Sequence, residues 1–182
     1  MNGIERINIV SDWNDPYIKK QQAMEPYANN IYYRIFSEIN YPLLNSQVNY
    51  ISCDKDDMNG RYDWQEGIDV ILHFYDGTKA TMQEKFLTYH YSTATFELQK
   101  SSGQLGAWFY CTAQYYFVGY EGINDFRDWI LLDLAALHRY DKKIDWKFNK
   151  NNPENNNRRS TFKYIEFDKI PSQCVVARRS AL

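Results

Sequence analysis

The sequence predicts an α+β domain with α/β/α layering, in which a mixed sheet built around a central β-hairpin is flanked by helices. Two observations predict this fold class. Apolar residues recur at helical spacing between residues 12 and 40, which indicates an amphipathic helix. Farther along the chain, two segments rich in β-forming residues, 68–75 and 79–87, flank the pair Asp76-Gly77, a strong signal for a hairpin turn.

Length and composition are those of a globular protein. The 182 residues suit a single domain, 1–182, and the hydrophobic fraction of 44% and aromatic fraction of 17% argue against disorder. No apolar run reaches the length of a membrane span, and residues 1–10 lack the apolar core of a signal peptide, so a cytoplasmic location without membrane contact is expected. The three cysteines are widely separated and have no histidines at ligand spacing, which indicates neither a disulfide framework nor a zinc site.

Charge is distributed unevenly along the chain. Residues 1–141 hold 11 Lys and Arg against 19 Asp and Glu, a balance of −8, whereas residues 142–182 hold 10 against 4, a balance of +6. Such asymmetry suits a basic C-terminal segment, 142–182, that contacts phosphates beside an acidic, metal-binding centre. It suits a solvated basic tail equally well.

The first predicted element is a helix over residues 12–40. Asp12 or Asp15 is its candidate cap, Pro16 falls in its first turn, and Pro26 is a candidate break. The apolar stripe that should pack on the sheet consists of Ala28, Ile31, Tyr32, Ile35, Phe36 and Ile39.

The segment between this helix and the hairpin is predicted to contain one strand and a turn. Residues 47–53 form the strand, and residues 54–60 form the exposed turn. The turn is not an EF-hand calcium loop, because Met58 occupies its fifth position and Gln65 stands where the twelfth position requires glutamate.

The hairpin register follows from the alternation of its side chains. In both strands the apolar residues have even numbers: Ile68, Val70, Leu72 and Phe74 in the first, and Ala80, Met82 and Phe86 in the second. Directly opposed residues of an antiparallel pair share a face, so even must pair with even, which needs an odd loop such as a three-residue turn with a glycine bulge. This register gathers Asp69, Gln83 and Lys85 on one face and leaves Glu84 on the apolar face.

The later elements are predicted from periodicity and breakers. Strands are expected over 93–99, 114–120 and 161–167, a short helix over 107–113, a second long helix from Phe126 to Tyr140, and a loop over the Asn-rich residues 149–157. Glu97 on the 93–99 strand could approach the hairpin face. His138 is interpreted as a cation at a helix C-terminus.

The hairpin face carries a recognisable set of side chains. A carboxylate, a second oxygen ligand and a lysine on neighbouring strands can hold Mg²⁺ and place a cation beside a scissile phosphate. The pattern Gly67-Ile68-Asp69 followed by Gln83-Glu84-Lys85 resembles the restriction-endonuclease-like, or PD-(D/E)XK, nuclease superfamily, most closely its Mrr-like branch. The resemblance implies a Mg²⁺-dependent endodeoxyribonuclease of restriction or phage type, with Mn²⁺ as a substitute ion.

The resemblance also implies residue roles. Asp69 would bind the metal, Gln83 or Glu84 would complete its shell, and Lys85 would orient the attacking water and stabilise charge on the phosphate. Most of the superfamily has a carboxylate where Gln83 stands, so Glu84 competes with Gln83 for this role. The first helix of the superfamily often lends an acidic residue to the metal site, and Glu25 is the candidate here.

DNA is the expected partner. Arg158 and Arg159 precede the 161–167 strand, in which Lys163 alternates with aromatic residues, a pattern suited to contacts with a nucleic-acid backbone. The oligomeric state stays open between a monomer and a homodimer.

Other interpretations compete with the nuclease. One is a catalytically inactive nuclease-fold protein that binds nucleic acid or another partner, because the neutral amide of Gln83 binds Mg²⁺ less well than a carboxylate. Another is an inhibitor or structural protein that never touches DNA, which would suit the acidic first 141 residues. The simplest is a solvated hairpin with ordinary surface charges.

Overall fold

The computed structural model describes residues 4–6, 16–38, 66–74, 76–89, 91–100, 102–150 and 160–179. Several sequence predictions lie outside these ranges: the 47–53 strand, the 54–60 turn, most of the 149–157 loop, and both Arg158 and Arg159.

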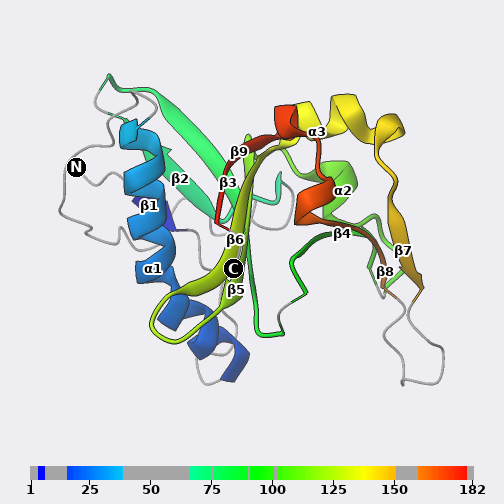
Figure 1. The fold of residues 1–182 in the computed structure, drawn as a ribbon, viewed down its shortest axis with the longest axis horizontal. Coiled ribbons are helices and arrows are strands. Elements are labelled where there is room, and N and C mark those ends of the chain that lie inside the picture. Colours follow the sequence, from blue (N-terminus) through cyan, green and yellow to red (C-terminus); the bar gives the residue numbers. More distant parts are fainter. Residues whose placement is uncertain are drawn as a thin grey trace.

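The described residues form two sheets and three α-helices (Figure 1). The larger sheet has the order β1-β2-β3-β5-β6-β9, and the smaller has the order β4-β8-β7. The strands are β1 (Ile4–Arg6), β2 (Val70–His73), β3 (Lys79–Leu87), β4 (Thr93–Gln99), β5 (Tyr115–Glu121), β6 (Phe126–Asp133), β7 (Lys147–Lys150), β8 (Thr161–Glu166) and β9 (Val175–Arg179). The helices are α1 (Pro16–Glu38), α2 (Ala107–Tyr110) and α3 (Leu134–Tyr140), with 3₁₀ turns η3 (Asp141–Lys143), η4 (Phe167–Lys169) and η5 (Ser172–Cys174).

The fold is mixed α+β, as predicted. In the larger sheet β3 runs parallel to β5, and the other described neighbours are antiparallel. Helix α1 covers one face of this sheet, while α2, α3 and the smaller sheet lie on the other side (Figure 1). Among the described residues, no helix combines the length and the apolar content needed to cross a membrane.

The predicted even-to-even register is confirmed for residues 70–73, which pair with 79–82. It does not extend to Ile68, which belongs to the same buried cluster as Tyr116 and Ile130 and not to that of Val70 and Leu72. Val70 lies opposite Met82 and Leu72 opposite Ala80, so even residues pair with even residues. At the turn, the Phe74 N–H donates to the Thr78 carbonyl at 3.0 Å and the Gly77 N–H donates to the Phe74 carbonyl at 3.1 Å. Gly77 closes the loop with a φ of 82°, the left-handed conformation that a glycine bulge requires.

The alternation of the strands separates two apolar clusters. Even-numbered residues of β2 and β3 pack with α1, whose buried stripe includes Ala28, Tyr32 and Phe36. On the other face, residues of β5 and β6 such as Tyr116 and Ile130 pack with α2, α3 and the smaller sheet. The larger sheet therefore divides the α1 side of the molecule from the α2 side.

Helix α1 begins at Pro16, as expected for a residue that favours the first helical turn. The predicted break at Pro26 is wrong, because the helix runs unbroken to Glu38. Pro26 is exposed, and the buried stripe continues past it on the opposite side of the helix. Packing of that stripe on the sheet holds the helix together despite the hydrogen bond that proline cannot donate.

The predicted helix from Phe126 to Tyr140 is wrong over its first half. Phe126–Asp133 is strand β6, and only Leu134–Tyr140 is helical. The run Trp129 to Leu132 is buried on both faces of a central strand, and such a continuous apolar run does not distinguish strand from helix by its periodicity. The carboxylate of Asp133 then caps α3 by accepting from the Ala136 N–H at 2.8 Å.

The remaining sequence predictions agree with the structure in part. Strands β4, β5 and β8 lie where they were expected, and α2 is shorter than predicted, because it ends at Tyr110. Strands β1, β7 and β9 were not predicted.

Candidate functional site

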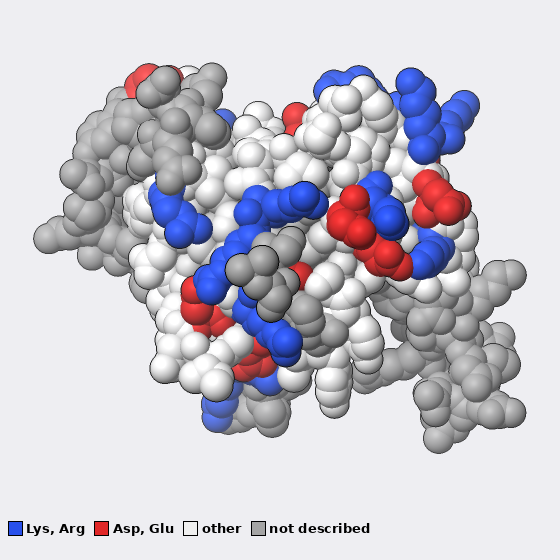
Figure 2. Space-filling view, in the orientation of Figure 1, with Lys and Arg blue, Asp and Glu red and all other residues white. Residues whose placement is uncertain are grey.

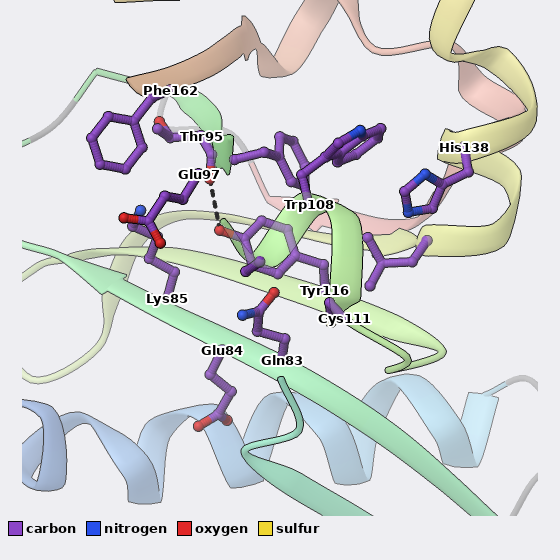
Figure 3. Close-up of a pocket in the computed structure, with 13 residues that line it drawn as sticks. Gln83, Glu84, Lys85, Thr95, Glu97, Trp108, Cys111, Tyr116, His138 and Phe162 are labelled. Carbon is purple, nitrogen blue, oxygen red and sulfur yellow. Dashed lines mark hydrogen bonds between the residues drawn. The ribbon is translucent and has the colours of Figure 1, made fainter. Parts of the chain in front are cut away.

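Strand β3 directs its alternate side chains to opposite sides of the sheet. Gln83 and Lys85 point into a pocket on the α2 side, whereas Glu84 points toward α1 (Figure 3). The Glu84 carboxylate accepts a hydrogen bond of 2.5 Å from the Tyr32 hydroxyl on α1. The structure therefore separates Gln83 from its competitor Glu84, and it is Gln83 that shares a face with Lys85.

Asp69 lies where the hairpin leaves its regular ladder. Its N–H donates to the Met82 carbonyl at 2.8 Å, one step out of the β2–β3 register, and its carboxylate accepts from the Glu84 N–H at 2.7 Å. The side chain thus replaces a backbone acceptor that the departing chain no longer supplies. Gly67 makes this departure, with a φ of 62° and close contact with Cys111.

The Asp69 carboxylate acts electrostatically on Cys111, a residue of the pocket lining. Burial raises the pKa of the Cys111 thiol to about 11, and the negative charge of Asp69 adds to this increase. Cys111 lines the same pocket as Gln83 and Lys85. Gln83 and Lys85 therefore line one pocket, and Asp69, which is not part of that lining, lies close enough to act on Cys111 at its edge.

The pocket has a volume of about 370 Å³ and lies between the two sheets. Strand β3 forms one wall, β4 and β8 form another, and α2 and α3 contribute at the back (Figure 3). Its lining includes the polar residues Gln83, Lys85, Thr95, Glu97 and His138 and the aromatic residues Phe96, Trp108, Tyr116 and Phe162. This size and this mixture of apolar walls with a few polar groups are typical of ligand sites.

Lys85 is held in a poorly hydrated environment. Burial lowers the pKa of Lys85, and the negative charge of Glu97 on β4 opposes that decrease. The Lys85 ammonium also lies 5.4 Å from the ring centroid of Phe162 on β8. A lysine with a lowered pKa in a pocket is a recognised mark of a functional site.

Glu25 does not join this group. It is buried, with 7% of its surface exposed, on helix α1. Helix α1 lies on the opposite face of the sheet from the pocket into which Gln83 and Lys85 point (Figure 3). Within the described part of the chain, no group of three or more His, Cys, Asp and Glu side chains could hold a metal ion.

The donor set of the pocket still suits one kind of ion. It comprises the Gln83 amide oxygen and, across the pocket, the Glu97 carboxylate, with the Asp69 carboxylate near Cys111 at its edge. Mg²⁺ is commonly bound by one or two carboxylates with water completing its shell, so these oxygen donors fit Mg²⁺ or Mn²⁺. They do not fit Zn²⁺, which prefers nitrogen and sulfur ligands.

Lys163 is a structural residue in this arrangement. It is 3% exposed, and its ammonium lies 3.2 Å from the ring centroid of Trp108 and 4.1 Å from that of Trp146. The Asp141 carboxylate accepts from it at 2.5 Å. The alternation of β8 turns Lys163 into the core, so the predicted contact between Lys163 and nucleic acid is not supported by its position.

His138 contributes to the pocket, which the sequence did not indicate. Its ring lies 4.1 Å from the Trp108 ring, centroid to centroid. Burial lowers the pKa of His138, the nearby Lys163 ammonium lowers it further, and Asp141 opposes both. The imidazole is therefore biased toward its neutral form rather than toward the helix C-terminal cation that was predicted.

The chain matches no protein-family model, and comparisons with curated proteins and with solved structures gave no match either.

Proposed function

We propose that the protein is a Mg²⁺-dependent endonuclease with a restriction-endonuclease-like fold, which hydrolyses phosphodiester bonds in DNA. The observation that carries this proposal is that Gln83 and Lys85 line one pocket, with the Asp69 carboxylate held on the same strand pair by the Glu84 N–H and acting on Cys111 of the lining. The order of elements also supports it, because a hairpin bearing these residues is followed by a crossover to the parallel strand β5. A cytoplasmic location and the choice between monomer and homodimer stay predictions.

Each residue of the pocket has a role in this proposal. Asp69 and Gln83 would hold the ion, which when bound would polarise the phosphate and lower the pKa of a water. Lys85 would donate hydrogen bonds to the attacking water and to a phosphate oxygen, and would offset the charge that develops there. The partly desolvated surroundings strengthen these interactions relative to their strength in bulk water.

A second candidate is a nuclease-fold protein that binds nucleic acid without cutting it. The amide at Gln83 favours it, as does the lack, within the described residues, of a cluster of three or more potential His, Cys, Asp or Glu ligands. Binding by such a protein would not depend on a divalent ion.

A plasmid-nicking assay with Mg²⁺ or Mn²⁺, and with a chelator as the blank, tests the proposal. Lys85→Ala should reduce cleavage by about 10²-fold or more, because removal of one preorganised charge-stabilising group has this order of effect. Lys79→Ala is the matched control. Lys79 lies on the same strand with the same parity but is exposed at the turn, and its loss should leave cleavage unchanged.

The outcomes separate the candidate functions. If the wild type cleaves no duplex, single-stranded or branched DNA and no RNA, the nuclease proposal is wrong. Binding to these substrates without cleavage would then support the binding protein. If the protein neither binds nor cleaves any of these substrates, a structural or inhibitory role is the best remaining explanation.

A further inference from the structure

The smaller sheet presents an aromatic face beside the pocket. In the β4–β8 pairing, Glu97 lies opposite Phe162 and Thr95 lies opposite Tyr164, so these four side chains share one face of the sheet. Lys163, between the two aromatic residues, points to the other face and is buried. Phe162 and Tyr164 are only partly buried.

This face continues directly into the candidate site. Phe162, Glu97 and Thr95 all line the pocket that contains Lys85 (Figure 3). Tyr164 stands two residues from Phe162, about 7 Å farther along the same strand. The two rings therefore form a short row that leads away from the proposed catalytic lysine.

The size of the pocket restricts what can enter it. A cavity of about 370 Å³, walled by β3 on one side and by β4 and β8 on the other, has room for a group of nucleotide size. An intact double helix is far too large to enter it. An unpaired nucleotide is flexible enough to enter, and its base offers a flat face to an aromatic ring.

We propose that Phe162 and Tyr164 form a stacking track for unpaired bases, and that the substrate is single-stranded DNA, either free or as a single-stranded end or flap. Cleavage of the bound strand rests on the proposed nuclease function, whereas binding of the strand to the track does not. Aromatic residues on a sheet surface bind single strands in this way with little sequence preference, because every base has a π face. The row is placed so that a strand stacked on it would deliver a phosphate toward Lys85.

Binding in the presence of a chelator tests the track without cleavage. Fluorescence anisotropy would compare labelled oligodeoxythymidylate with a hairpin duplex. Phe162→Leu and Tyr164→Leu, which remove a ring but keep an apolar side chain, should each weaken binding of the single strand by about 5-fold to 150-fold. Phe162→Tyr should restore affinity, because it keeps the ring.

Phe148→Leu is the matched control. Phe148 is 63% exposed and lies on the adjacent strand β7, opposite Lys163, so its side chain is on the other face of the same sheet. Its loss should leave affinity for the single strand unchanged. Thermal unfolding of each variant, followed by circular dichroism, would exclude a loss of binding caused by unfolding.

The results distinguish failure of the track from failure of the nuclease. Affinity for the duplex that equals or exceeds that for the single strand, or leucine variants that bind like wild type, would overturn the track. Metal-dependent cleavage of duplex DNA in that case would leave the nuclease proposal intact. Conversely, single-strand binding that depends on both rings, without cleavage of any substrate, would establish the track and refute the nuclease.

Discussion

Replacing Lys85 by methionine should make the protein more stable while abolishing cleavage. Methionine keeps the length of the lysine stem and removes the ammonium. Burial lowers the pKa of Lys85 despite the opposing charge of Glu97, so the surroundings of this side chain disfavour its charged form overall. Lysine at this position therefore costs folding free energy at neutral pH.

The expected gain is about 1 kcal/mol in the free energy of unfolding, within the range of about 0.5–2 kcal/mol that single stabilising substitutions give. Two losses limit it: the attraction to Glu97 and the contact of the ammonium with the Phe162 ring at 5.4 Å. For a chain of 182 residues, a gain of this size raises the melting temperature by about 2–4 °C.

The pH dependence identifies the cause. Because the pKa of Lys85 is lower in the folded than in the unfolded protein, the unfolded chain binds more protons between the two values, and wild-type stability rises with pH across that window. The penalty is complete below the folded pKa and vanishes above the unfolded value of about 10.4. The advantage of Lys85→Met should therefore shrink as the pH approaches 10.4. Urea unfolding followed by fluorescence of the five tryptophans measures it.

The opposite result would exclude a net cost of burying Lys85. If Lys85→Met unfolds more easily than wild type at neutral pH, and the difference does not change with pH, then Glu97 outweighs the cost of burial. Lys85 would in that case be a structural partner of Glu97 rather than a residue kept for its chemistry.

Two further predictions concern residues that the structure removes from the site. Glu84→Gln should leave metal-dependent cleavage within a few-fold of wild type, since its carboxylate bonds Tyr32 on the far face; a loss comparable to that of Lys85→Ala would instead make Glu84 a ligand. Asp141→Asn should lower the free energy of unfolding by about 1–2 kcal/mol in urea titrations, because it leaves the Lys163 ammonium without its carboxylate. That value is below the usual cost of breaking a buried pair because the Asp141 side chain is 38% exposed. If stability is unchanged and DNA binding is weaker, Lys163 is instead a nucleic-acid contact, as the sequence predicted.

The hairpin could be predicted from the sequence because its determinants are local. Strand alternation and the turn residues Asp76 and Gly77 fix which residues oppose one another, and hence which faces Gln83, Glu84 and Lys85 occupy. The helix α1 was predictable for the same reason. Its apolar stripe is a short-range pattern that tertiary packing reinforces.

The rest of the site could not be predicted, because it depends on contacts between distant segments. The approach of Glu97 to the hairpin face was predicted, but Phe162 and His138 come from two other elements, and only the pairing of β4 with β8 and the position of α3 bring them to the pocket. The 126–140 segment was misassigned because burial on both faces removes the alternation that marks a strand. Strand β8 does alternate basic and aromatic residues, but Lys163 lies on its buried face.

A crystal soaked in Mn²⁺ would show whether the hairpin holds a metal ion, because anomalous scattering locates the ion without any assumption about the substrate. A peak is expected on the pocket side of the hairpin, within coordination distance of the Asp69 carboxylate and the Gln83 amide oxygen, and it should be lost in Asp69→Asn. A peak on the α1 side, at Glu84 or Glu25, would contradict the assignment of the site. No peak at either place in a crystal that binds Mn²⁺ elsewhere would contradict the metal-dependent nuclease itself.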